Sequence, residues 1–345
     1  MATLLSCPSS FYSPASTPTS ATALTFTQDQ GTWIYCNFPE SITSRSQFGN
    51  HVSGYGNVYL NQVSVNGTVQ FFASHLNSYG SSFNYGVQLY NPNASSVTVT
   101  ILNNGFRASS DWLSVECGVW SDFFATPGGN QYIVGSGQSL WIIQKSVPSS
   151  ALFNAVMRFQ TTNTMYCTEY VYDPNVNNID GTATLFPWNG SRVYRGHGNS
   201  YFIRATYDIY VSQMPYKFYT NICSDPQANS EMITIYDPTG TQFSCPGANL
   251  GNWGAQYYFT INVHNNTSSS ATIRAYVGSD QSGGSAPSVM NLGGSVVYCG
   301  PGANQMWNWL QDTISANSTQ QYIYQFIHAA NASGPTRHDW RLGSS

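Results

Sequence analysis

The sequence predicts an all-β protein: two related β-sandwich domains, of jelly-roll or Ig-like type, that follow a flexible N-terminal arm. Three observations support this fold class. Short apolar runs separated by turn residues recur roughly every ten residues, which is the spacing of sandwich strands. A strand–turn–strand pattern occurs in both halves of the chain, and the long 3.6-residue periods of helices are missing.

The first element is residues 1–24, which are rich in Ser, Pro, Thr and Ala. This composition is typical of a flexible arm. Leu24 and Phe26 alternate with threonines at its end and predict a short strand. The start of the chain lacks the basic and apolar regions of an ordinary secretory signal, so we do not expect one there.

The clearest strands lie in residues 85–102. Apolar and polar residues alternate there on both sides of a turn at 91–96, so we interpret the segment as a hairpin of half-buried strands. The same pattern returns in residues 259–277, with its turn at 265–270. Both segments are therefore expected to be equivalent parts of two repeated domains.

Two further pairs of segments extend the repeat. Residues 139–144 resemble 306–311, and residues 151–159 resemble 318–326, both at an offset of 167 residues. The polar, Gly-rich stretch at 195–200 separates the halves. We therefore predict a first sandwich over residues 25–195 and a second over 200–345.

Composition excludes several classes of protein. Only 8% of residues are charged and the net charge is −4, which gives no basic surface for nucleic acid. Aromatic residues make up 15%, unlike disordered chains, and no apolar run is long enough to span a membrane. A weakly charged, aromatic β surface favours association with other molecules.

Seven cysteines are present, without the spacing of a zinc motif. Because the number is odd, at least one thiol is free or pairs between molecules. The arm carries Cys7, so we expect it to add its strand, through Leu24 and Phe26, to a neighbouring subunit, with Cys7 locking the contact. The alternative is a disordered tail with an idle thiol.

Several stretches resemble uncharacterised β-rich proteins of spore-forming bacteria: GVQLYNPN (86–93), SQMP (212–215), NWGAQYYF (252–259) and TIRAYVG (272–278). The resemblance covers most of the chain after the arm. It brings no catalytic residue, but it implies an extracellular location on a cell or spore surface.

Candidate sites are few. Exposed tryptophans stack on sugar rings, and the candidates for glycan binding are Trp188, Trp253 and Trp340. Oxygen ligands alternate in a loop that resembles a calcium site, although the sixth-position Gly and closing Glu of an EF-hand are absent. The candidate calcium ligands are Asp173, Asn175, Asn177 and Asp180. Otherwise we expect no cofactor.

A serine protease is a weaker interpretation. Residues 280–284 (DQSGG) and 72–75 (FASH) resemble the nucleophile and histidine motifs of chymotrypsin-like proteases, but Gln281 separates the acid from the serine. The six histidines are scattered and are expected to be surface or locally hydrogen-bonded residues.

We therefore predict a structural protein rather than an enzyme: a subunit that assembles with itself into an extracellular surface layer or filament. The alternative is a glycan-binding adhesin or carbohydrate-binding module, with surface glycans as partners. A secreted hydrolase is the third interpretation. Neither nucleic-acid binding nor a membrane-spanning role is expected.

Overall fold

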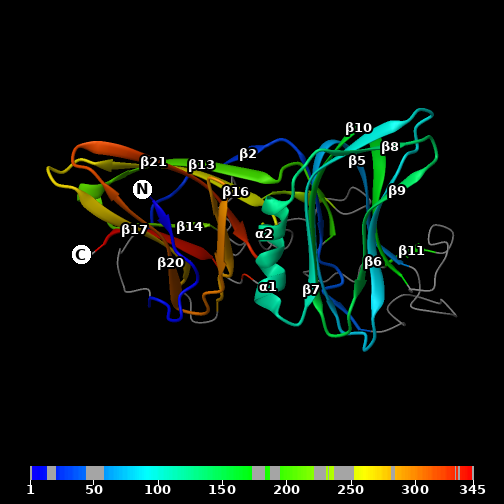
Figure 1. The fold of residues 1–345 in the computed structure, drawn as a ribbon, viewed down its shortest axis with the longest axis horizontal. Helices are drawn as coiled ribbons and strands as arrows, with labels where there is room; N and C mark the ends of the chain where they lie inside the picture. The colour runs from blue at the N-terminus through cyan, green and yellow to red at the C-terminus, as the bar shows by residue number, and fades with distance from the viewer. Residues whose placement is uncertain are drawn as a thin grey trace. The chain divides into compact units, whose positions relative to one another are not determined.

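The computed structural model describes residues 2–13, 21–43, 58–172, 183–186, 195–220, 231, 233–236, 252–280, 284–330, 332 and 335–343. Strands dominate this part of the chain, which confirms the all-β class (Figure 1). No helix in the described ranges is long and apolar enough to cross a membrane.

The chain divides into two compact units. Unit 1 comprises Met1–Gln30, Tyr201–Ile233 and Asn249–Ser345, and unit 2 comprises Gly31–Ser200 and Thr234–Ala248. The main division thus falls at the polar break around residue 200. The arm and residues 25–30, however, belong with the second half of the sequence, because the strand at Thr27–Asp29 pairs with Phe202–Arg204.

Unit 2 is a sandwich formed by one large sheet that folds over on itself. Its strands are β3 (Thr32–Cys36), β4 (Ser41–Ile42), β5 (Val58–Asn77), β6 (Phe83–Tyr90), β7 (Val97–Ser109), β8 (Asn130–Val134), β9 (Ser139–Val147), β10 (Leu152–Tyr172), β11 (Thr184–Leu185), β12 (Arg195–Gly198) and β15 (Ile235–Tyr236). Two short helices, α1 (Trp112–Glu116) and α2 (Gly118–Ala125), follow β7.

The fold of this sheet depends on its two longest strands. β5 and β10 pair along their whole length, but β7 joins only the first half of β10 and β6 joins only its second half. The change occurs where the register shifts between Thr161 and Met165, opposite Gly67 at φ +73°. A bulge of this kind bends a strand, so β5 and β10 pass from one layer into the other.

Unit 1 is a sandwich of two separate sheets. One sheet has the strand order β1 (Thr3–Leu4), β20 (Gln305–Ile314), β17 (Ala271–Ser279), β22 (Thr336–Leu342), β14 (Tyr216–Thr220). The other has the order β19 (Ser295–Cys299), β18 (Ser288–Leu292), β21 (Ser318–His328), β16 (Gln256–Asn265), β13 (Phe202–Tyr210), β2 (Thr27–Asp29). A 3₁₀ turn at Val211–Gln213 precedes β14.

The predicted hairpins are wrong in their pairing, although their strands exist. β6 pairs with β9 and β10, whereas β7 pairs with β8 and β10. Likewise β16 and β17 lie in different sheets of unit 1. Each turn is therefore an arch between the two layers of a sandwich. Alternating burial identifies a strand, but it does not identify the partner of that strand.

One buried asparagine begins each arch. The amide of Asn91 donates to the carbonyls of Ser95, Val134 and Gly135 at 2.9–3.0 Å. In unit 1 the amide of Asn265 donates to Ser269, Ile314 and Ser315 at 2.9–3.0 Å. Both side chains are at most 1% exposed, and each one donates to one buried carbonyl, that of Val134 or Ile314, besides two partly buried ones.

These contacts correct the predicted alignment of the halves. Asn91 reaches the end of β8, and Asn265 reaches the end of β20, so β8 is the counterpart of β20. The strand that enters each arch pairs with a later strand of the chain. In unit 2 β6 pairs with β9, and in unit 1 β16 pairs with β21. The predicted matches of residues 139–144 with 306–311 and of 151–159 with 318–326 are therefore both shifted by one strand, because alternating strands resemble one another in several registers.

The arm belongs to its own chain. β1 pairs with β20, Tyr12 bridges to Met306, and β2 pairs with β13. Phe26 is buried against Tyr257 and Phe259, and Leu24 is half-buried. The predicted strand through Leu24 and Phe26 is thus displaced to Thr27–Asp29, and the pairing that we expected between subunits occurs within one molecule.

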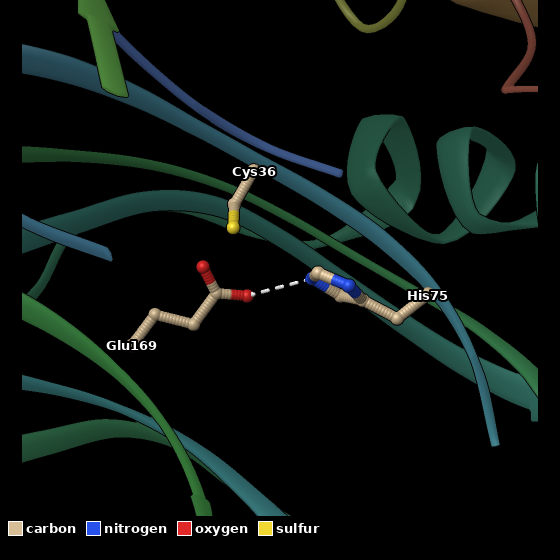
Figure 2. A group of neighbouring side chains, drawn as sticks. All are labelled: Cys36, His75 and Glu169. Carbon is tan, nitrogen blue, oxygen red and sulfur yellow. Dashed lines mark hydrogen bonds and ion pairs between the residues drawn. The ribbon is translucent and has the colours of Figure 1, made fainter. Parts of the chain in front are cut away.

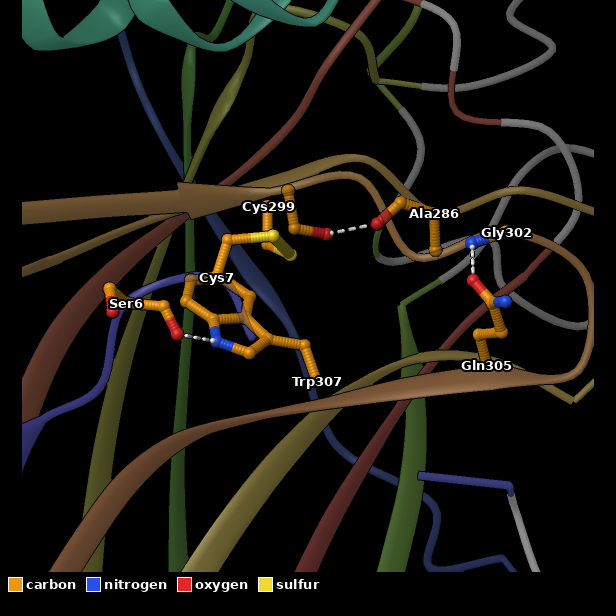
Figure 3. Close-up of a disulfide and its surroundings, with 8 residues drawn as sticks. Ser6, Cys7, Ala286, Cys299, Gly302, Gln305 and Trp307 are labelled. Carbon is orange, nitrogen blue, oxygen red and sulfur yellow. Dashed lines mark hydrogen bonds between the residues drawn. A yellow bond between two sulfur atoms is a disulfide. The ribbon is translucent and has the colours of Figure 1, made fainter. Parts of the chain in front are cut away.

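Cys7 forms a disulfide with Cys299 of the same chain, which contradicts the expected bond between subunits (Figure 3). The neighbouring Ser6 carbonyl accepts a hydrogen bond from the indole of Trp307 at 3.2 Å. Cys36, Cys117 and Cys167 are free and buried, while Cys223 and Cys245 lie outside the described residues.

Two buried histidines lie between the sheets of unit 1. His338 contacts the hydroxyl of Thr220 at 3.0 Å and stacks on Phe218, and His328 contacts Thr336 at 3.2 Å. Nε2 of His328 and Nδ1 of His338 have no hydrogen-bond partner. Burial lowers the pKa of His328 to about 3, and burial together with the charge of His328 lowers the pKa of His338 well below its usual value.

We expect unit 1 to lose stability as the pH falls below about 6.5, the usual pKa of histidine in an unfolded chain. Below that pH the unfolded chain takes up protons that the folded core does not accept. This difference lowers the free energy of unfolding by about 2 kcal/mol for each histidine between pH 7 and pH 5. Urea unfolding at several pH values measures how steeply the free energy of unfolding falls as the pH is lowered. His328→Gln should make this pH dependence less steep. An unchanged pH dependence would show that the buried His328 does not cause the loss of stability.

Candidate functional site

The outer face of the β5–β10–β6 layer carries a hollow of about 290 Å³. Because side chains alternate along a strand, Val87 and Leu89 point into the core while Gln88 and Tyr90 point outward. The same alternation exposes Tyr166 on β10. We define the tyrosine face by the residues that line this hollow: Gln62, Gln88, Tyr90, Gly137, Ser139, Tyr166, Thr168 and Tyr170.

Two tyrosines form the most accessible part of the tyrosine face. Tyr90 and Tyr166 are register partners on β6 and β10, with ring centroids 6.4 Å apart and planes only 4° apart. They are 38% and 42% exposed, so both rings offer a surface to a ligand. Two nearly parallel exposed rings suit a flat, partly apolar ligand such as a sugar ring.

Polar groups surround the rings. The Gln62 amide donates to the hydroxyl of Thr168 at 2.9 Å, which fixes the orientation of both side chains. Trp141 of β9 packs against Tyr170, with centroids 5.6 Å apart. None of the eight lining residues is charged. The chemistry of the tyrosine face is therefore that of amides, hydroxyls and aromatic rings, which fits a neutral polyhydroxylated ligand.

The opposite layer of unit 2 has a different outer surface. α1 and α2 pack against β7 and the first half of β10, and Figure 1 shows them beside β7. Trp120 of α2 stacks on Phe72, whose ring stacks on Tyr35. The helices come close because Gly105 has no side chain: a Cβ there would lie 2.3 Å from the Val119 carbonyl.

The sequence pattern does not predict these helices. Their start is marked by Asp111, whose carboxylate accepts from the Ser114 backbone N–H at 3.3 Å, and this is an N-cap signal. A tertiary contact also holds the helices: Arg107 of β7 forms a bidentate ion pair with Asp122 of α2, with N–O distances of 2.7 and 2.9 Å. Helices of 5 and 8 residues are too short to show a clear period of 3.6.

A cluster of chemically active side chains lies in the core of unit 2. Cys36 of β3, His75 of β5 and Glu169 of β10 present their sulfur, nitrogen and oxygen atoms within 4.8 Å of one another (Figure 2). Nε2 of His75 is 3.2 Å from Oε1 of Glu169. The Tyr85 hydroxyl donates to the same oxygen at 2.6 Å. We call Cys36, His75 and Glu169 the buried triad.

The buried triad has no access to solvent, since its three members are at most 1% exposed. Burial, then the negative charge of Glu169, raises the pKa of the Cys36 thiol and of the Tyr85 hydroxyl well above their usual values. A cysteine that acts as a nucleophile needs a lowered pKa and an open approach. The buried triad has neither, so it does not form a site for a substrate.

Of the three tryptophans expected to bind glycans, the structure describes Trp253 and Trp340. Trp340 is 1% exposed and packs between Trp309 and Tyr322 in the core of unit 1, so that prediction is wrong. Trp253 is partly buried and donates to the Ala332 carbonyl at 2.9 Å. Trp188 lies outside the described residues, as do Asp173, Asn175, Asn177 and Asp180 of the expected calcium loop.

The protease motifs receive no support. His75, the expected base, is enclosed in the core of unit 2, and its ring nitrogens face Glu169 and the Pro39 carbonyl. Asp280 accepts from Tyr219 and Arg337 in unit 1, and residues 281–283 lie outside the described residues.

No family model and no curated protein matches this chain. Among solved structures, a Paenibacillus xanthan lyase matches with a TM-score of 0.16 and 10% identity, over 85% of this chain and 25% of the lyase. The CBM22-1–CBM22-2 tandem domain of Paenibacillus barcinonensis Xyn10C matches with a TM-score of 0.14 and 7% identity, over 86% of this chain and 100% of that chain. A Campylobacter jejuni multicopper oxidase matches with a TM-score of 0.11 and 6% identity, over 75% and 48%. The chain thus spans about a quarter of the lyase, and TM-scores this low carry no inference about function.

Proposed function

We propose that the protein is an extracellular glycan-binding module whose binding site is the tyrosine face. The observation that carries this proposal is the pair of parallel, exposed rings of Tyr90 and Tyr166 above an uncharged hollow lined by amides and hydroxyls. Sugars are bound in this way: the apolar side of the ring stacks on an aromatic face, and hydroxyl groups bond to neighbouring polar side chains.

The absence of charge on the tyrosine face narrows the ligand to a neutral polysaccharide. An acidic polysaccharide would be matched by lysine or arginine, and neither occurs among the eight lining residues. The hollow opens to solvent beside the exposed rings of Tyr90 and Tyr166, which suits the side of a chain rather than a small molecule enclosed on all sides. We assign the module to binding rather than to catalysis.

An extracellular location agrees with the Cys7–Cys299 disulfide, because such bonds persist in oxidising compartments. A place on a cell or spore surface is part of the proposal. Assembly into a layer or filament stays a prediction, but the arm and Cys7 no longer argue for it, since both are used within the chain.

We expect Tyr90→Ala and Tyr166→Ala each to weaken binding to a neutral polysaccharide roughly tenfold, because each removes about 1.4 kcal/mol or more of ring stacking and apolar burial. Affinity electrophoresis through gels that contain neutral β-glucan, xylan or mannan measures the retardation. Both side chains are exposed, so melting should change little.

The matched control is Tyr132→Ala on β8, where an equally exposed tyrosine, 43% accessible, lies outside the tyrosine face. Its retardation should equal that of the parent protein. Failure of the parent protein to bind any neutral polysaccharide on a broad array would refute the proposal. Equal loss in all three variants would show that the tyrosine face is not the site.

A further inference from the structure

The buried triad places three ionisable side chains in the core of unit 2, close enough to the buried guanidinium of Arg195 that its charge opposes part of the rise in the pKa of Cys36. A carboxylate, an imidazole and a thiol lie together in an apolar core, among Val87, Phe153 and other residues of the hydrophobic cluster. Burying an ionisable group costs several kcal/mol unless it is paired or bound to a metal. Oε2 of Glu169 is buried and has no hydrogen-bond partner.

The hydrogen bonds of His75 define which nitrogen is free to act as a ligand. Nδ1 lies 2.8 Å from the carbonyl oxygen of Pro39, and a carbonyl only accepts, so Nδ1 carries a proton. Nε2 is then the nitrogen that faces Oε1 of Glu169, at 3.2 Å, and its lone pair is the one that a bound metal ion would use. A histidine that donates from one nitrogen to a backbone carbonyl and presents the other to a ligand set is the usual arrangement at metal centres.

The distances suit a metal ion. Zinc bonds to histidine nitrogen and carboxylate oxygen are about 2.0–2.1 Å long, which places two such ligands about 3.3 Å apart in a tetrahedron. Nε2 of His75 and Oε1 of Glu169 are 3.2 Å apart. The sulfur of Cys36 faces the same carboxylate from another strand (Figure 2). It lies within 4.8 Å of both atoms, and its thiol donates to the Phe38 carbonyl at 3.6 Å, so a rotation of Cys36 away from that carbonyl would complete the third bond.

The donor set indicates the class of ion. One thiolate, one imidazole and one carboxylate form a mixed sulfur, nitrogen and oxygen set that suits Zn²⁺, whereas Ca²⁺ and Mg²⁺ take oxygen ligands. Tyr85 supports the site by donating to Oε1 of Glu169 at 2.6 Å. Ligands on β3, β5 and β10 would join the two layers of unit 2 at one point.

We propose that Cys36, His75 and Glu169 bind one divalent transition-metal ion of the zinc class as a structural centre in the core of unit 2. On binding, the ion replaces the thiol proton of Cys36, which is released to solvent. Because the site is closed, the ion enters during folding. This centre is independent of the tyrosine face and of the proposed glycan binding.

The test uses the full chain, expressed in medium that contains Zn²⁺ and purified without chelator. Elemental analysis should find about one zinc per chain in the parent protein and less than about one tenth of that in Cys36→Ser and His75→Gln. Cys117→Ser is the matched control, since it removes another fully buried free thiol that lies outside the buried triad, and it should keep the metal.

A second measurement does not depend on how well the variants fold. The parent protein is unfolded in guanidinium with a chelator and refolded with Co²⁺, whose bond to a thiolate gives a strong near-ultraviolet absorption. One equivalent of Co²⁺ should saturate this signal, and Zn²⁺ should remove it. Parent protein that is folded by circular dichroism but holds no zinc and shows no cobalt–thiolate absorption would overturn the proposal.

Discussion

Asn91→Asp and Asn265→Asp are each expected to lower the free energy of unfolding of their own unit by about 3 kcal/mol or more. Each substitution removes an amide that donates to three carbonyls and replaces it with a carboxylate of the same shape. In each unit one buried carbonyl, that of Val134 or Ile314, and two partly buried ones then face an oxygen instead of a donor. Urea unfolding followed by tryptophan fluorescence measures the loss.

Asn163→Asp provides the control. Asn163 is exposed, and its side-chain oxygen accepts from the Thr164 backbone N–H at 2.8 Å, a bond that aspartate keeps. The free energy of unfolding of the Asn163→Asp variant should stay within about 0.5 kcal/mol of the parent value. If Asn91→Asp or Asn265→Asp also changed stability by less than about 1 kcal/mol, the arches would not depend on these amides.

The second large effect concerns the disulfide. Cys7→Ser is expected to destabilise unit 1 by about 2–5 kcal/mol, because the bond closes a loop of great length and restricts the unfolded chain. The two cysteines are 292 residues apart in the sequence. The start of the arm is also held by the short strand β1, by the hydrogen bond from Trp307 to the Ser6 carbonyl and by Tyr12 beside Met306. Proteolysis within residues 2–13 should therefore accelerate in the variant.

The same destabilisation should follow when the parent protein is treated with a reductant, and Cys7→Ser should then show no further change. Cys117→Ser, a buried thiol in unit 2, should leave the unfolding of unit 1 unchanged. A variant as stable and as protease-resistant as the parent would show that the arm is held by its strand alone.

The strands of this protein follow from local sequence. The alternation around residues 87–89 and 97–101 identifies β6 and β7 because one face of each strand is buried and the other is not. The turn residues of both arches were located for a similar reason, since Asn, Pro and Ser mark bends through their own backbone chemistry. The all-β class is the sum of such local signals.

Sequence could not give the partners of these strands. A pattern of period two fits any neighbour with a matching face, so the arches looked like hairpins and the repeat was aligned one strand out of register. The partner of Asn91 at Val134 is 43 residues away, and no local rule predicts such a contact. The pairing of Cys7 with Cys299 is likewise a property of the folded chain.

For the candidate sites, too, sequence predicts the kinds of residue, whereas tertiary structure decides which residues meet. Abundant aromatic residues and scarce charge predict a surface that binds other molecules, but they do not tell which aromatic residues are exposed, and Trp340 is buried in the core. What makes Tyr90 and Tyr166 a pair is the register of β6 against β10, which aligns two residues 76 positions apart. Similarly, Cys36, His75 and Glu169 have no shared motif, and only three strands meeting in one core place them together. Sequence alone determined which residues alternate and bend, whereas tertiary structure decided which of them meet, because contact between distant strands is set by the packing of the whole sandwich.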